Sequence, residues 1–221
     1  MKYKTWVFDF DYTLADATAG IVESVNYALN QLGLEASSRE DIRKTVGMKL
    51  DDIFCELTDI SDEQSAKLFV SNFMYMADKI MTDNTVLFDD TIDVLSQLRQ
   101  SNCNTAIVST KCHYRIDEAL AKFNITNLID YIVGLEDVAD AKPSPEGLLK
   151  VIDYFGSDKQ SVLFIGDSLI DAKTAANAGV DFAAVLTGTT TAQDFLKFSH
   201  IHIANNLSEF KNCIDNHHTI C

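Results

Sequence analysis

The sequence predicts an α/β protein with a doubly wound parallel sheet and a helical domain inserted after the first strand. A short apolar run at residues 5–10 is typical of a β-strand, and roughly 70 residues with helical spacing follow it. From about Leu87 onward, short apolar strands alternate with helices, as in a parallel sheet. We therefore expect a core domain of residues 1–14 and 86–221 and a helical cap domain of residues 15–85.

The composition excludes several classes of protein. The 221 residues are 47% hydrophobic, which is enough for one core and a small second domain. A net charge of −15 disfavours nucleic acid and anionic membrane surfaces as partners. The five cysteines form no CxxC pattern, so we expect reduced thiols rather than disulfides or a zinc site. No apolar run of about 18 residues occurs, so the chain is expected to be cytoplasmic. A monomer or homodimer is expected.

The first apolar run is expected to form a central strand covered on both faces. From about Ala17 to Met81, apolar residues recur at the spacing of amphipathic helices. Gly33 ends the first of these segments, and Ser38 with Asp41 forms a capping-box-like start of the next. No strand is expected inside this block.

Helices and strands alternate after the insertion. The expected elements are helices over 90–100, 113–123, 145–155 and 169–178, strands over 105–108, 130–133, 161–165 and 182–186, then a weaker helix and the stretch HIHIA at 200–204. Ligands of open α/β sheets bind at the carboxyl ends of the strands, so the polar residues that follow each strand are the candidates for a site.

Two aspartates, Asp9 and Asp11, lie at the carboxyl end of the first strand. Residues two apart share a face if the strand stays extended, so both carboxylates are expected to reach one point. An unpaired buried carboxylate costs several kcal/mol, which predicts a partner for this pair.

Two further stretches of the sequence supply hydroxyl and ammonium groups that could bind phosphate. Ser109 and Thr110 end an apolar strand and offer donors for phosphate oxygens, although serine is also common in turns. Lys142 precedes both prolines of the chain and is expected to be held rigidly by Pro143. Behind it, Ser144 is the expected N-cap of a helix, with Pro145 as its first residue.

A further acidic pair, Asp167 and Asp171, follows the apolar strand that ends in Gly166. Gly166 allows close approach of the backbone. If these two acids converge with Asp9 and Asp11, the four carry a formal charge of −4, of which Lys142 would offset one unit. Such an all-oxygen cluster requires a cation and suits Mg²⁺.

Together these motifs resemble the haloacid dehalogenase superfamily of phosphohydrolases over nearly the whole chain. "DFDYTL" is similar to the first motif of the family, Ser109 to its second, Lys142 in "KPSP" to its third, and "GDSLID" to its fourth. The inserted helices resemble the cap of the phosphoglycolate phosphatase and β-phosphoglucomutase branch, and the resemblance implies the strand order 5-4-1-2-3. Tyr12 departs from the family, which most often has glycine there.

The resemblance also implies roles for the acidic residues. Asp9 would be the nucleophile that forms an aspartyl-phosphate, and Asp11 would serve as general acid and then general base. Mg²⁺ would be bound by the carboxylates of Asp9 and Asp167 and by the backbone carbonyl of Asp11, while Asp171 would bind it directly or through water. Ser109, Thr110 and Lys142 would hold the phosphoryl oxygens.

The expected function is that of a Mg²⁺-dependent phosphatase acting on a small phosphorylated metabolite, similar to phosphoglycolate phosphatase. Lys49 in "VGMKLDD" lies in the cap segment that faces the active site of related enzymes, so it is a candidate substrate contact, although a solvated lysine is the simpler interpretation. Alternative activities are a sugar-phosphate mutase and a pyrophosphatase or nucleotidase. A phospho-acceptor signalling module is the non-enzyme alternative.

Overall fold

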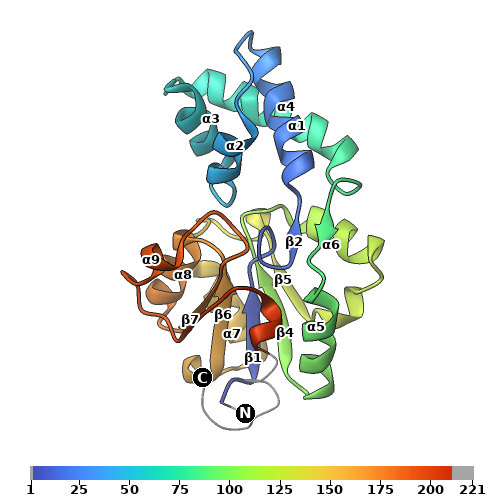
Figure 1. The fold of residues 1–221 in the computed structure, drawn as a ribbon, viewed down its shortest axis with the longest axis vertical. Helices are drawn as coiled ribbons and strands as arrows, with labels where there is room; N and C mark the ends of the chain where they lie inside the picture. Colours follow the sequence, from blue (N-terminus) through green and yellow to red (C-terminus); the bar gives the residue numbers. More distant parts are fainter. Residues whose placement is uncertain (1, 211–221) are drawn as a thin grey trace. The chain divides into compact units, whose positions relative to one another are not determined.

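The computed structural model describes residues 2–210, which form two compact units (Figure 1). The core unit contains the residues up to Ala15 and those from Leu87 onward, and the helical unit contains residues 16–86. Two cysteines, Cys213 and Cys221, lie outside the described residues. No helix within residues 2–210 is long and apolar enough to cross a membrane.

The core unit is built on a parallel sheet of six strands with the order β5-β4-β1-β6-β7-β8. The strands are β1 (Thr5–Phe8), β4 (Asn104–Val108), β5 (Tyr131–Val133), β6 (Val162–Gly166), β7 (Asp181–Val185) and β8 (His202–Ala204). Counted in chain order, the first five follow the predicted order 5-4-1-2-3, and β8 extends the sheet beyond β7. The predicted α/β fold is therefore confirmed.

Helices cover both faces of this sheet. They are α5 (Thr91–Gln100), α6 (His113–Lys122), α7 (Glu146–Phe155), α8 (Leu169–Ala178) and the short α9 (Ala192–Phe195), with 3₁₀ turns η1 (Thr126–Leu128), η2 (Leu135–Asp137), η3 (Lys159–Ser161) and η4 (Leu207–Phe210). Side chains alternate along β1, so Trp6 and Phe8 pack in the cluster with α5 and α6, whereas Val7 packs in the cluster with α7, α8 and α9. The central strand is buried on both faces, as its apolar sequence predicts.

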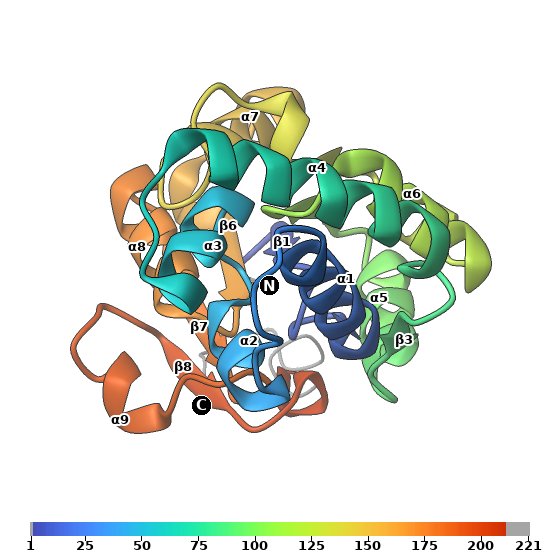
Figure 2. The ribbon, with the colours of Figure 1, turned by 90° about the horizontal axis from the view of Figure 1, so that it is seen from above.

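The helical unit consists of α1 (Thr18–Gln31), α2 (Arg39–Thr45), α3 (Leu50–Thr58) and α4 (Glu63–Ile80) (Figure 2). Its own apolar cluster includes Val25 and Phe69. Gly33 follows α1 with a φ of +72°, and the Ser38 hydroxyl caps α2 by accepting a hydrogen bond from the Asp41 amide. The glycine that ends α1 and the serine that caps α2 are therefore both confirmed.

Two short connecting segments join the units. They form strands β2 (Ala15–Asp16) and β3 (Val86–Leu87), which pair as a separate two-stranded sheet. The Asp16 carboxylate accepts a hydrogen bond from the Thr18 amide at 2.7 Å and so fixes the start of α1.

Candidate active site

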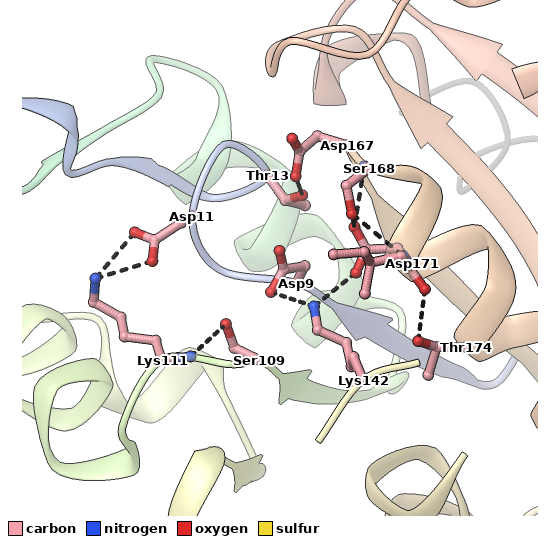
Figure 3. A network of polar contacts seen from close by, with 11 residues as sticks. Asp9, Asp11, Thr13, Ser109, Lys111, Lys142, Asp167, Ser168, Asp171 and Thr174 are labelled. Carbon is pink, nitrogen blue, oxygen red and sulfur yellow. Dashed lines mark hydrogen bonds and ion pairs between the residues drawn. The ribbon is translucent and has the colours of Figure 1, made fainter. Parts of the chain in front are cut away.

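The polar side chains of the site follow three neighbouring strands of the core sheet (Figure 3). Asp9 comes directly after β1, Ser109 directly after β4, and Asp167 directly after β6. Because β1 lies between β4 and β6 and all three run parallel, their carboxyl ends meet at one edge of the sheet. The topology alone therefore brings together residues more than 150 positions apart.

Three buried carboxylates form the centre of the site. Asp9, Asp167 and Asp171 each place an oxygen within 4.8 Å of the others. Asp171 is oriented by a capping box at the start of α8, where its Oδ2 accepts hydrogen bonds from the Ser168 amide at 3.1 Å and the Ser168 hydroxyl at 2.6 Å. The capping box uses Oδ2 and leaves Oδ1 of Asp171 to accept a hydrogen bond from Lys142.

Lys142 contacts two of these acids. Its Nζ lies 2.6 Å from Asp171 Oδ1 and 2.8 Å from Asp9 Oδ1. Burial lowers the pKa of Lys142, but the neighbouring Asp171 and Asp9 carboxylates outweigh it and raise the pKa above its ordinary value. The lysine therefore stays charged and partly neutralises the cluster.

The helix behind Lys142 begins one residue later than predicted. Pro145 is the N-cap and α7 starts at Glu146, whereas Ser144 was the expected N-cap. The Glu146 carboxylate accepts hydrogen bonds from the amides of Ala139 and Asp140 at 3.0 and 3.1 Å. The first residue of α7 is thus bonded to the preceding loop.

Burial raises the pKa of Asp167 well above its ordinary value, and the Asp171 and Asp9 charges raise it further. Burial also raises the pKa of Asp171, while Lys142 opposes this change. For both residues burial is the main cause of the raised pKa, and the charge of neighbouring aspartates adds to it.

Two glycines allow this crowding. A Cβ atom at Gly188 would lie 1.9 Å from Asp167 Oδ2, and one at Gly166 would lie 2.5 Å from Asp171 Cβ. Gly166 was singled out in the sequence for close approach, whereas Gly188 was missed because nothing in the loop after β7 marks it. The backbone itself forms the wall behind both carboxylates.

The structure corrects the expectation for Asp11. β1 ends at Phe8, and the chain turns at Tyr12, whose φ is +61°. The side chain of Asp11 therefore does not join the acidic cluster, because the extended geometry that would place it beside Asp9 stops too early. Instead, both of its carboxylate oxygens lie 3.0 Å from Lys111 Nζ.

Lys111 is a site residue that the sequence analysis missed. It stands two residues after Ser109 in "STK", and this proximity to a strand end could have indicated it. Burial raises the pKa of Asp11, and the charge of Lys111 opposes this rise. With Lys111 included, the four aspartates and two lysines carry a formal charge of −2, and not the −3 that follows from Lys142 alone.

The remaining predicted residues lie as follows. Ser109 is buried, and its hydroxyl accepts a hydrogen bond from the Lys111 amide at 3.3 Å. Thr110 is half-buried in the same turn. Lys49 belongs to the helical unit, where it is half-buried at the N-cap position of α3, and its role stays a prediction.

Tyr12 is buried, and its carbonyl accepts a hydrogen bond from the Thr187 hydroxyl. Its left-handed backbone conformation is one that glycine adopts without strain. The local turn is therefore formed with tyrosine in a position that favours glycine.

The donor set fits a divalent cation. All three carboxylates of the cluster are buried and supply oxygen, the atom that hard cations prefer. The Lys142 ammonium lies 2.8 Å from Asp9 Oδ1 and 2.6 Å from Asp171 Oδ1 and supplies one positive charge to three acids. The cluster therefore still has carboxylate oxygens to offer a cation.

Comparison with known proteins gives related sequences and folds. A haloacid dehalogenase-like hydrolase described from Bacteroides fragilis is 40% identical, with a TM-score of 0.92, over 95% of this chain and 100% of that one. Pyrophosphatase PpaX of Bacillus cereus is 25% identical over 185 residues, which cover 84% of both chains. A predicted phosphoglycolate phosphatase from Haemophilus somnus shares the fold at a TM-score of 0.86 and 21% identity, over 96% of this chain and 98% of that one.

The family model for haloacid dehalogenase-like hydrolases matches residues 6–185. This range runs from β1 to the end of β7 and includes the ends of β1 and β6, which carry the acidic cluster. The resemblance seen in the sequence motifs is thereby confirmed: the chain belongs to the haloacid dehalogenase-like hydrolases and is an enzyme of their phosphatase type.

Proposed function

We propose that this enzyme hydrolyses a small phosphate monoester with Mg²⁺ as its cofactor and Asp9 as its nucleophile. The observation that carries the proposal is the buried Asp9 carboxylate, which pairs with the Lys142 ammonium and has an oxygen within 4.8 Å of those of two further acids. A carboxylate in this setting can attack phosphorus while nearby positive charge stabilises the transferring group.

The cofactor would be held by the carboxylates of Asp9, Asp167 and Asp171 and by the backbone carbonyl of Asp11. When bound, Mg²⁺ would offset the formal charge of the site and neutralise charge that develops on the phosphoryl oxygens. Ser109 would donate a hydrogen bond to a phosphoryl oxygen.

The reaction has two displacements. In the first, an Asp9 oxygen attacks phosphorus, the bond to the leaving oxygen breaks, and Asp11 donates its proton to that oxygen. In the second, Asp11 takes a proton from water, which attacks the aspartyl-phosphate and releases inorganic phosphate. Lys142 holds the phosphoryl oxygens through both steps, so that most of the catalysis is positioning and electrostatics.

Small phosphorylated acids such as phosphoglycolate are the proposed substrates. A net charge of −15 disfavours long polyanions, and in this proposal the helical unit acts as a cap that limits substrate size. Pyrophosphate is the second candidate, because a relative that covers 84% of this chain is named a pyrophosphatase. A mutase is less well supported, since the first histidine of the sequence is His113, in the core unit.

A substrate panel tests this specificity. We expect kcat/KM for phosphoglycolate to exceed that for phosphopeptides and oligonucleotides at least tenfold, which corresponds to about 1.4 kcal/mol. Lys49→Ala should raise KM for phosphoglycolate more than KM for 4-nitrophenyl phosphate, because only the former carries a second anionic group. Lys67→Ala, at a lysine whose side chain is 75% exposed in the same unit, is the control.

Other outcomes of the panel count against parts of the proposal. Efficient phosphopeptide hydrolysis contradicts the size limit, and equal KM changes on both substrates remove Lys49 from the site. Faster turnover of pyrophosphate than of every monoester would replace the leading substrate class with the second candidate.

Mg²⁺ should stabilise the fold, since it binds a site that forms only in the folded chain. At 100 times its dissociation constant, the cation is expected to add about 2.7 kcal/mol to the free energy of unfolding. Asp167→Asn should reduce this gain, whereas Asp153→Asn, at an exposed position of α7, should not. Thermal unfolding in Mg²⁺ and in chelator measures the difference, and an unchanged melting temperature would argue against one shared site.

A further inference from the structure

The pair formed by Asp11 and Lys111 is mostly shielded from solvent, which sets it apart from the surface ion pairs of the core unit. The Lys111 side chain is 6% exposed and that of Asp11 is 14% exposed. Desolvation of two charges can cost more than their attraction returns, so a buried pair is weak evidence of a purely stabilising role. The pair is therefore a candidate for a role in function.

Both partners are fixed at adjacent strand ends. Asp11 lies in the turn after β1, and Lys111 lies in the turn after the neighbouring β4. The Lys111 amide donates to the Ser109 hydroxyl at 3.3 Å, and the Lys111 carbonyl accepts from the Leu135 amide at 3.0 Å. The ammonium lies 5.5 Å from the centre of the buried Phe10 ring. Both the backbone and the ammonium group of Lys111 are therefore held in place.

The geometry of the contact constrains Asp11 closely. Both carboxylate oxygens are 3.0 Å from the same nitrogen, so the edge of the carboxyl group that carries the two oxygens faces Lys111. Asp11 is also the one predicted catalytic acid that has no carboxylate oxygen in the acidic cluster of the described residues. Lys111 therefore sets the direction of a side chain that the metal ligands do not orient.

We infer that Lys111 is a positioning residue, which holds the Asp11 carboxyl group in the orientation from which it exchanges a proton with the leaving group and then with water. The inference rests on the proposed function, in which Asp11 is the acid and base. When the O–H bond of Asp11 breaks and the proton joins the leaving oxygen, the negative charge left on Asp11 faces the Lys111 ammonium.

This role predicts a dependence on the leaving group. An alkoxide is a poor leaving group and needs the proton of Asp11, whereas 4-nitrophenolate leaves without one. Loss of Lys111 should therefore slow the hydrolysis of glycerol 2-phosphate much more than that of 4-nitrophenyl phosphate. Neither substrate carries a second anionic group, so the comparison does not measure charge recognition.

The test uses Lys111→Met, which keeps the length of the side chain, with Lys111→Gln as a second neutral variant and Lys111→Arg as the conservative one. On glycerol 2-phosphate we expect kcat to fall about 30-fold for the neutral variants, within the range that general acid catalysis contributes. On 4-nitrophenyl phosphate the fall should stay within about threefold, with KM changed less than about twofold on both substrates. Lys111→Arg should restore most of the loss.

Lys159→Met is the matched control. Its ammonium donates a hydrogen bond to the Ala178 carbonyl at 2.7 Å in the core unit and has no part in the site. Its kinetics should equal those of the wild type on both substrates. Thermal unfolding of every variant shows whether it is folded before its kinetics are compared.

Equal losses on the two substrates, or a rise in KM with kcat unchanged, would overturn the inference. Asp11→Asn on the same substrates separates this failure from a failure of the proposed function. If Asp11→Asn shows the leaving-group dependence and the Lys111 variants do not, only the role of Lys111 is wrong. If Asp11→Asn shows none, the acid and base role of Asp11 is wrong as well.

Discussion

Asp9→Asn is expected to lower turnover more than 100-fold, a loss of at least about 2.7 kcal/mol of transition-state stabilisation. An amide cannot form the bond to phosphorus, and no other group is proposed as nucleophile. The fold should persist, because the substitution keeps the shape of the side chain and removes one of three carboxylates that lie within 4.8 Å of one another.

Steady-state kinetics and trapping of the phosphoenzyme after acid quench measure this effect. The wild type should incorporate label from a phosphorylated substrate, and Asp9→Asn should incorporate none. Asp153→Asn, at an exposed aspartate of α7, should behave as the wild type does. Residual activity above about one per cent would count heavily against Asp9 as the nucleophile.

Lys142→Met is expected to lower the free energy of unfolding by about 3–5 kcal/mol in the presence of chelator. The lysine contacts Asp9 and Asp171, and both of these carboxylates are buried. Methionine keeps the apolar part of the side chain but removes the charge, so the two acids are left in a low-dielectric site without their ammonium partner. Turnover should also be lost, because in the proposed reaction Lys142 holds the phosphoryl oxygens.

Urea denaturation of the wild type and the variant gives the difference in stability. The double variant Lys142→Met with Asp171→Asn is the control. It removes one of the two carboxylates left without the ammonium, so it should recover part of the lost free energy of unfolding. A stability of Lys142→Met within about 1 kcal/mol of the wild type would mean that solvent already screens the cluster, against the burial seen in the structure.

The fold and the acidic cluster could be predicted because both follow from patterns that act over short distances. Alternation of apolar strands with helices predicts a parallel sheet, and a parallel sheet brings its strand ends together. Asp9 and Asp167 each stand directly after a strand, so their convergence needs no knowledge of individual side-chain directions.

The partner of Asp11 could not be predicted in the same way. Its direction depends on a turn in which Tyr12 takes a φ of +61°, and the residue types of the turn do not determine that angle. The contact between Gly188 and Asp167 depends on the order of β6 and β7 and on the path of the loop after β7. Both features arise from backbone geometry that residue patterns leave open.

The close backbone behind Asp167 and Asp171 has a consequence for how the site gains and loses a cation. Gly188 and Gly166 bring the backbone against these carboxylates, which lie close together, so a bound proton or a cation would relieve their repulsion. Proton and metal would then compete for the same oxygens, and capture of a cation would release protons. The affinity for the proposed Mg²⁺ would therefore fall as the surroundings become more acidic, which would couple the activity of the enzyme to pH.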